Sequence, residues 1–312
     1  MEKALLLRRC VLRISCGMWL LSLLYQAGAQ ELEPRAYSVS PIGTSFVGMA
    51  FGRSSGDVTF DPTIPITNIK ATLYFPGLGL GQTFPLFRRQ ALITAVIPYA
   101  WGTVKGDVYE QQGSISRSGM PDIKTRFSIN LRGSPALTPR EFARRKPHGL
   151  VIGTSLTMTA PSGQYSNEKL INLGTNRWSF KPEVGISVPV KRFDLDAYAG
   201  VWLFTENASF YPSYSSRTQA PLVAVQTHVS YTVRRGLWAA LDYTWYGGGA
   251  VTVNGGTPSE RQSNSRAGAT LSLPVHTGHS VKIAYSSGVS GNIGSKFNTV
   301  SVGWQYVWFD RR

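Results

Sequence analysis

Residues 121–132 read Pro-Asp-Ile-Lys-Thr-Arg-Phe-Ser-Ile-Asn-Leu-Arg. Every second side chain from Ile123 to Leu131 is apolar or a threonine, and those between them, from Asp122 to Arg132, are polar or charged. Successive side chains of a β-strand point to opposite faces. The alternation therefore predicts a strand with one apolar face and one polar face.

The same alternation recurs along the chain in segments of about ten residues, which Gly, Pro, Ser and Asn separate. No stretch after residue 30 shows a long helical period. The predicted strands are 43–52, 69–80, 88–99, 121–132, 149–160, 179–189, 194–205, 221–232, 237–247, 265–273, 280–288 and 299–309. These are twelve strands, and splitting or merging one segment would give ten or fourteen.

The connections between these segments alternate in length. Short joins lie at 82–87, 190–193, 233–236 and 274–279, and longer ones at 53–68, 100–120, 161–178, 206–220, 248–264 and 289–298. The join 133–148 is an exception, because it is long on the short side and could hold a helix at 139–144. Alternating joins are typical of outer-membrane barrels, which have short periplasmic turns and longer extracellular loops. The fold class predicted is all-β, a closed antiparallel up-and-down transmembrane β-barrel of about 12 strands.

A two-layer sandwich would also have one apolar face per strand, so the aromatic residues decide between the two folds. Trp and Tyr gather at the ends of the predicted strands, where the membrane interfaces of a barrel would lie. They are Tyr99, Trp101, Trp178, Trp202, Trp238, Tyr243, Trp245, Tyr246, Trp304 and Trp308. This distribution favours the membrane barrel, whose closure leaves no unpaired strand edge in hydrocarbon.

Composition and the N-terminus indicate an exported protein. Of the 312 residues, 16% are charged, against about 25% in a typical soluble domain, and 42% are hydrophobic. Residues 1–29 carry a basic head, an apolar run too short for a spanning helix, and Ala27-Gly28-Ala29, which together predict a cleaved signal peptide. The barrel domain is then 30–312. Because Cys10 and Cys16 both lie in the signal, the mature chain has no thiol for a disulfide or a metal.

The net charge of +15 would be compatible with binding to nucleic acid. We discount it because the chain is expected to be exported and its cations form no single run. The mean hydropathy of −0.09 excludes a protein with several apolar transmembrane helices.

The predicted last strand resembles the C-terminal signal by which outer-membrane barrels reach the barrel-assembly machinery. Ser301, Gly303, Tyr306 and Trp308 supply its polar, glycine and aromatic positions, although four further residues follow Trp308. The expected partners are therefore that machinery and outer-membrane lipid. The expected location is the outer membrane of a Gram-negative bacterium.

Several longer stretches resemble one outer-membrane family, described as "putative MetA-pathway of phenol degradation". They include 170–183 (LINLGTNRWSFKPE), 160–165 (APSGQY), 199–202 (AGVW) and 264–266 (NSR). The resemblance covers essentially all of the mature chain. It implies an outer-membrane barrel of transporter type, linked by name to aromatic catabolism.

If the apolar faces meet lipid, the polar faces line a lumen in which cations predominate. The residues expected to line the pore are Lys124, Arg126, Arg132, Lys181, Glu183, His228, Asp242, Arg266 and Lys282, with Lys70 as a further candidate. A positive lumen favours anions, so we predict passive passage of small anionic or aromatic solutes, without a cofactor, a metal or a catalytic residue.

Two alternatives stay open. The lumen charges could pair into a sealed structural barrel, with Lys181 and Glu183 as one ion pair. A lipid-modifying enzyme would need a nucleophile beside a base, and only His228 and Ser230 share a polar face. The loops 100–120 or 161–178 could also fold into the lumen.

Overall fold

The computed structural model describes residues 32–58, 66–108, 111–145, 149–169, 171–211, 214–291 and 295–309. The predicted signal peptide and its cleavage site lie outside these residues. In the described part of the chain, no helix is long and apolar enough to cross a membrane.

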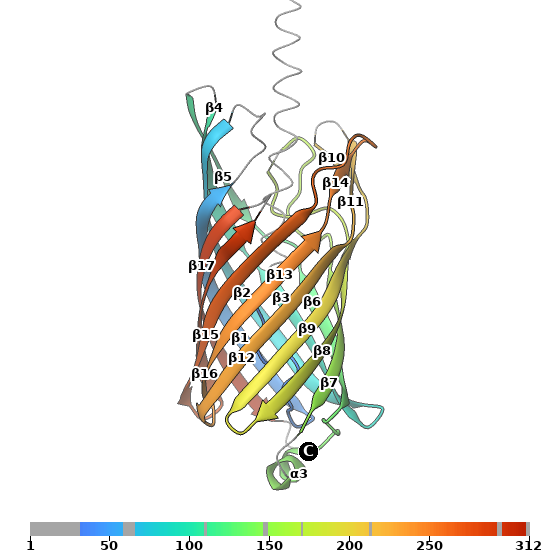
Figure 1. Cartoon of the computed structure of the whole chain (residues 1–312), viewed down its shortest axis with the longest axis vertical. Helices are drawn as coiled ribbons and strands as arrows, with labels where there is room; N and C mark the ends of the chain where they lie inside the picture. Colours follow the sequence, from blue (N-terminus) through green and yellow to red (C-terminus); the bar gives the residue numbers. More distant parts are fainter. Residues whose placement is uncertain are drawn as a thin grey trace, which may run out of the picture.

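One antiparallel sheet closes on itself, because β1 pairs with β17 on one side and with β2 on the other (Figure 1). The sheet comprises β1 (Thr44–Val58), β2 (Ile66–Leu86), β3 (Arg89–Pro98), β4 (Ala100–Val108), β5 (Gln111–Gly119), β6 (Lys124–Arg132), β7 (Val151–Thr159), β8 (Ser179–Val190), β9 (Phe193–Phe204), β12 (Leu222–Arg234), β13 (Leu237–Gly248), β15 (Gln262–His276), β16 (His279–Gly291) and β17 (Ser295–Phe309). β4 continues β3 along β2, and β5 pairs with β4 above the pairing of β6 with β3. The fourteen elements therefore form twelve wall strands, as predicted.

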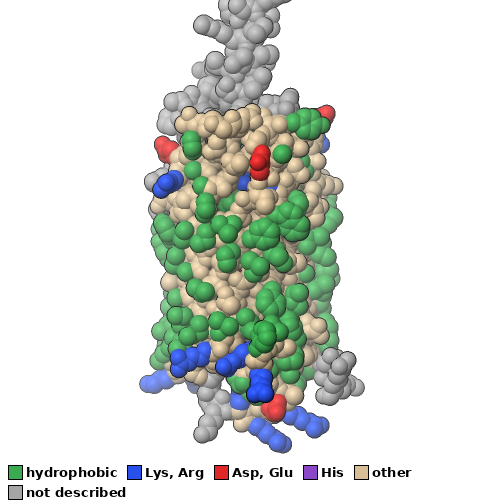
Figure 2. Space-filling view, turned by 90° about the vertical axis from the view of Figure 1, so that its right-hand side faces the viewer, with side chains coloured by type: hydrophobic (Ala, Val, Ile, Leu, Met, Phe, Trp, Pro, Cys, Tyr) green, Lys and Arg blue, Asp and Glu red, His purple; other side chains and the backbone are tan. Residues whose placement is uncertain are grey.

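The apolar faces point outward. On β8, Val184 and Ile186 are 60% and 46% exposed, whereas Lys181 and Glu183 on the other face are 2% and 3% exposed. Figure 2 shows hydrophobic side chains spread over the middle of the face in view. Two stacked sheets would bury these side chains, so the barrel is confirmed and the sandwich is excluded.

The two ends of the barrel differ as the joins predicted. Two-residue turns connect β2 to β3, β8 to β9, β12 to β13 and β15 to β16 at the lower end of Figure 1. The expected helix in the long lower join is present as α3 (Pro139–Arg144), which begins at the capping residue Thr138. The long loops lie at the upper end.

Some upper loops contain more strand than predicted. The join 100–120 was expected to be a loop, but its residues 100–108 and 111–119 extend the wall as β4 and β5. On the other side of the upper end, β10 (Asn207–Phe210), β11 (Ser215–Gln219) and β14 (Val251–Val253) form a small separate sheet (Figure 1). The alternation was weak here because strands beyond the membrane have no lipid-facing side, so both faces can be polar.

Most of the strand-end aromatic residues lie on the outer face, as girdles require. Tyr99, Trp101, Trp178, Tyr243, Trp245, Trp304 and Trp308 are 38–45% exposed. Trp202, Trp238 and Tyr246 are exceptions. Trp202 and Tyr246 are each 2% exposed and pack with Leu222 inside the barrel, and the ring of Trp238 lies in the lumen against the guanidinium of Arg35. Their assignment to a girdle was wrong. They lie inside because each falls on the inner register of its strand: Trp202 lies on the same face as Tyr198, and Trp238 and Tyr246 lie on the same face as Asp242 and Thr244.

Candidate functional site: the barrel lumen

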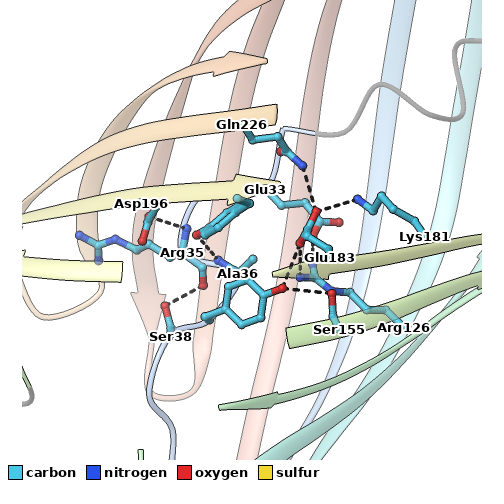
Figure 3. Close-up of polar contacts among 12 residues, drawn as sticks. Glu33, Arg35, Ala36, Ser38, Arg126, Ser155, Lys181, Glu183, Asp196 and Gln226 are labelled. Carbon is cyan, nitrogen blue, oxygen red and sulfur yellow. Dashed lines mark hydrogen bonds and ion pairs between the residues drawn. The ribbon is translucent and has the colours of Figure 1, made fainter. Parts of the chain in front are cut away.

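The lower part of the lumen holds a piece of the chain itself. Residues 32–41, which we call the N-terminal segment, precede β1 and lie inside the barrel (Figure 3). The chain then leaves the lumen at the lower end, where Ile42 N donates to Leu137 O at 2.9 Å and Gly43 N to Thr83 O at 2.9 Å. The sequence did not predict this segment, since ten irregular polar and apolar residues have no period.

Tyr37 anchors the segment in a slot between β7 and β8. Its ring lies over Gly153 and Gly185, where a Cβ atom at either position would overlap it. Its hydroxyl donates to Glu183 Oε1 at 3.1 Å and lies 3.1 Å from Ser155 Oγ. The side chain is 2% exposed. The two glycines therefore form a notch that one aromatic ring fills.

Arg35 anchors the segment on the opposite side. Its guanidinium forms an ion pair with Asp194 at 2.7 Å and donates to Thr232 Oγ1 at 2.7 Å. Its backbone N–H donates to Asp196 at 3.2 Å, and its guanidinium lies over the ring of Trp238. Four contacts on β9, β12 and β13 fix this residue.

Glu183 is the centre of the charged network in the lumen. It accepts from Arg126 at 3.0 Å and from Lys181 at 3.1 Å, in addition to Tyr37. Arg126 also pairs with Glu33 of the N-terminal segment. The predicted ion pair between Lys181 and Glu183 is confirmed. A buried carboxylate with several charge-assisted donors is well compensated, so this network holds the segment in place.

His228 is a poor candidate for a catalytic base. Its Nδ1 lies 2.7 Å from Asp242 Oδ1, and Asp242 accepts from Thr270 at 2.8 Å. However, His228 Nε2 and Ser230 Oγ are both buried without a hydrogen-bond partner among the described residues, so they are not bonded to each other. His228 and Ser230 are 1% and 0% exposed. This arrangement gives a substrate no access to a nucleophile beside its base.

The opposite wall of the lumen is open. Its inward residues are small and remain partly accessible although they face inside: Gly48 and Ala50 on β1, Gly77 and Gly79 on β2, and Gly303 on β17. We call this set the glycine wall. A Cβ atom at Gly79 would meet nothing nearer than Gly48 O at 3.9 Å. The N-terminal segment thus packs mainly against β6–β13, with further contacts to Gln90 on β3 and Gly268 on β15, and the glycine wall stays accessible.

Side chains beside the glycine wall give the open part its chemistry. Phe46 and Phe75 lie against the inner positions of Gly81 and Gly52, and Val96 on β3 is 40% exposed. Lys282 on β16 is exposed and its ammonium lies 5.6 Å from the ring of Trp238. The open part of the lumen is therefore mainly apolar, with an accessible cation.

The upper end is partly covered by loops above the packed side of the lumen. Asp122 accepts from the backbone N–H groups of Gly163 and Thr175, both at 2.8 Å, and so ties down the loop 161–178. Arg177 in this loop donates to Gln219 on β11 at 2.5 Å. Desolvation raises the pKa of Tyr165, whose hydroxyl donates to Ser209 O. The covered side is that of β7–β13.

The structure brings most of the predicted pore residues together. Lys124, Arg126, Lys181, Glu183, His228, Asp242, Arg266 and Lys282 lie on the inner face, whereas Arg132 lies exposed at the lower rim, beside a register shift in β6. Arg266 donates to Ser286 at 2.8 Å. Lys70 was placed wrongly: it faces outward, opposite Lys105. The inner positions 77, 79 and 81 of β2 are all glycine, so the sequence has no polar side chain there to show which face of the strand points inward.

Three carboxylates were missed, namely Glu33, Asp194 and Asp196. They offset much of the cationic excess that the predicted set implied. Asp194 and Asp196 alternate with apolar residues at the start of β9, and this pattern could have marked them as inward-facing. In the described chain, no group of three or more His, Cys, Asp or Glu side chains is placed to hold a metal ion.

Comparison with known proteins places the chain in a family. Residues 67–304 match the family model described as "Putative MetA-pathway of phenol degradation". The chain belongs to this family. The resemblance noted in the sequence is thereby confirmed. No curated protein matches this member of the phenol MetA-pathway family in sequence.

Solved structures share the barrel fold of this family member. An outer membrane channel from Pseudomonas putida F1 matches with a TM-score of 0.76 at 18% identity, over 89% of this chain and 100% of that one. The β domain of the Bordetella autotransporter BrkA matches with a TM-score of 0.51 at 12% identity, over 85% of this chain and 100% of that one. These likenesses show the outer-membrane barrel fold.

Proposed function

We propose that the protein is a passive outer-membrane channel for small solutes, and that they pass along the glycine wall beside the N-terminal segment. The observation that carries this proposal is the asymmetry of the lumen. Inner residues of β7–β13 are mostly buried, some against the N-terminal segment and some against one another, whereas Gly48, Ala50 and Gly79 stay accessible.

The solutes that suit this passage are small aromatic acids. Phe46, Phe75 and Val96 offer an apolar surface, and Lys282 is an accessible cation, whereas Glu183 is buried in ion pairs and Asp242 is buried in hydrogen bonds to His228 and Thr270. An accessible cation beside neutralised carboxylates favours anions. The family's description, which refers to phenol degradation, agrees with an aromatic solute.

Planar bilayers with the purified protein test the passage. Gly79→Trp should fill it and lower the conductance at least severalfold. Leu80→Trp is the matched control: this side chain is 43% exposed on the lipid face of the same strand, so conductance should not change. Equal conductance of both variants and the unchanged protein would place the passage elsewhere.

Selectivity tests the solute class. The unchanged protein should prefer chloride over potassium weakly, and Lys282→Glu should reverse this preference. Proteoliposomes should swell faster in benzoate than in a neutral sugar of similar size. Cation preference in the unchanged protein would contradict the proposal.

A sealed structural barrel is the second candidate, and the N-terminal segment favours it. Arg35, Tyr37 and Glu33 each bind the wall, so the lower lumen is blocked on that side. Absence of conductance both in the unchanged protein and after Tyr37→Ala would support this candidate over the channel.

A further inference from the structure

Three lower turns each carry two adjacent cations. They are Arg88-Arg89 between β2 and β3, Lys191-Arg192 between β8 and β9, and Arg234-Arg235 between β12 and β13. Figure 2 shows Lys and Arg side chains gathered along the lower rim, below the hydrophobic side chains. No hydrogen bond or ion pair joins these six side chains to another residue in the described ranges.

Two of these turns are neighbours. β9 pairs with β12, and Thr232 N donates to Arg192 O at 2.8 Å, which links the turns directly. Two strand spacings, about 10 Å, separate their centres. Lys191, Arg192, Arg234 and Arg235 are all exposed, so four unpaired cations share one short arc of the rim.

The acidic residues near this arc are already occupied or distant. Asp194, two residues after Arg192, points into the lumen and pairs with Arg35. Glu141 on α3 accepts from Thr138. Among the described residues no carboxylate pairs with the four cations, so they can attract an outside anion.

Apolar side chains continue directly above the four cations on the outer wall. Val190, Phe193, Tyr231 and Val233 are 46%, 45%, 38% and 51% exposed. The rings of Phe193 and Tyr231 lie 5.0 Å apart. An apolar strip that ends in a cluster of cations matches a molecule with acyl chains and an anionic headgroup.

The backbone conformation of Lys191 is one in which glycine is the favoured residue. Lys191 has φ of +56°, a left-handed conformation that favours glycine. A glycine would form this turn with less strain. The lysine adds a cation to the arc that a glycine would lack.

We propose that Lys191, Arg192, Arg234 and Arg235 bind the phosphates of an anionic phospholipid, whose acyl chains lie on Phe193, Tyr231 and their neighbouring valines. Four cations on two turns suit a headgroup with two phosphates better than one with a single phosphate. An acidic protein would use the cations but would leave the apolar strip uncovered. The inference rests on the proposed membrane placement and not on conduction through the lumen.

Native mass spectrometry of the full protein in detergent tests the site with three probes: cardiolipin, phosphatidylglycerol and phosphatidylethanolamine. Cardiolipin should bind most tightly and phosphatidylethanolamine most weakly. Each cation near a charged lipid surface raises the affinity roughly fivefold. The double variant Arg192→Gln, Arg234→Gln should therefore bind cardiolipin about thirtyfold more weakly.

The control has the same charge loss at the same end of the barrel. Arg140→Gln with Arg144→Gln on α3 removes two exposed cations that lie away from the apolar strip, and cardiolipin affinity should change less than threefold. Equal weakening by both double variants, or equal affinity for the three lipids, would overturn the proposal. Competition by glycerol phosphate as effective as by cardiolipin would also overturn it, since the acyl chains would then contribute nothing.

Conductance measurements distinguish a failure of the lipid site from a failure of the proposed channel function. The Arg192→Gln, Arg234→Gln variant should conduct as the unchanged protein does, because both side chains lie outside the lumen. A silent channel that still binds cardiolipin would refute conduction alone, and a conducting channel without lipid preference would refute this site alone.

Discussion

Removing the hydroxyl of Tyr37 should loosen the N-terminal segment without disturbing the barrel. In Tyr37→Phe, the ring still fills the notch between Gly153 and Gly185, and only the hydrogen bonds to Glu183 and Ser155 are lost. A hydrogen bond to a charged group contributes about 1.5–3 kcal/mol. Glu183 still accepts from Arg126 and Lys181 in the variant, so we expect a loss at the lower end of this range, about 1.5 kcal/mol. The equilibrium constant for release of the segment from the wall should then rise about tenfold.

Hydrogen–deuterium exchange measures this release directly. The backbone N–H groups of Arg35 and Ala36 donate to Asp196 and to the hydroxyl of Tyr198, so they exchange only when the segment leaves its place. Their exchange should be about tenfold faster in the variant.

The matched control is Tyr243→Phe, which removes a hydroxyl from a lipid-facing ring that is 44% exposed. Exchange at residues 35 and 36 should not change in it. A change of less than twofold in Tyr37→Phe, or an equal change in both variants, would refute the role given to the Tyr37 hydroxyl.

Three further predictions concern packing, pH and a turn. Gly185→Ala should lower the free energy of unfolding by about 1–3 kcal/mol in urea titrations, because the added methyl overlaps a buried ring, whereas Gly79→Ala should be nearly neutral. Hydrogen bonds from the backbone N–H and the hydroxyl of Thr138 hold the pKa of Glu141 below its usual range, so the cap of α3 should persist at neutral pH and be lost as acid titrates the carboxylate. NMR amide shifts should follow this loss, and Thr138→Ala should move it to higher pH without abolishing it, because the backbone N–H remains. Arg88 has φ of +60°, a left-handed conformation that strains a residue with a Cβ atom. Arg88→Gly should therefore raise the free energy of unfolding by about 1 kcal/mol, measured by refolding into detergent.

The sequence was sufficient for the wall of the barrel but not for its contents. Alternation at 121–132 identified β6 because lipid and lumen impose opposite demands on its two faces. The same reasoning placed Lys181 and Glu183 in the lumen, and their contact follows from their spacing on one strand.

The N-terminal segment could not be found in this way, because one buried Tyr37 among irregular residues has no period. Its trace in the sequence was indirect. Gly153 and Gly185 fall on inner faces of strands where larger side chains would otherwise fill the lumen, and only the fold reveals that they face the same ring.

A wall made of glycine and alanine offers a passing molecule few functional groups to recognise. Along the glycine wall itself the rate of passage depends on the cross-section of the solute, and discrimination by chemistry comes from the neighbouring Phe46, Phe75, Val96 and Lys282. Enlarging Gly48, Gly79 or Gly303 by a few carbon atoms would therefore narrow the range of cargo more than most exchanges of polar groups elsewhere in the lumen.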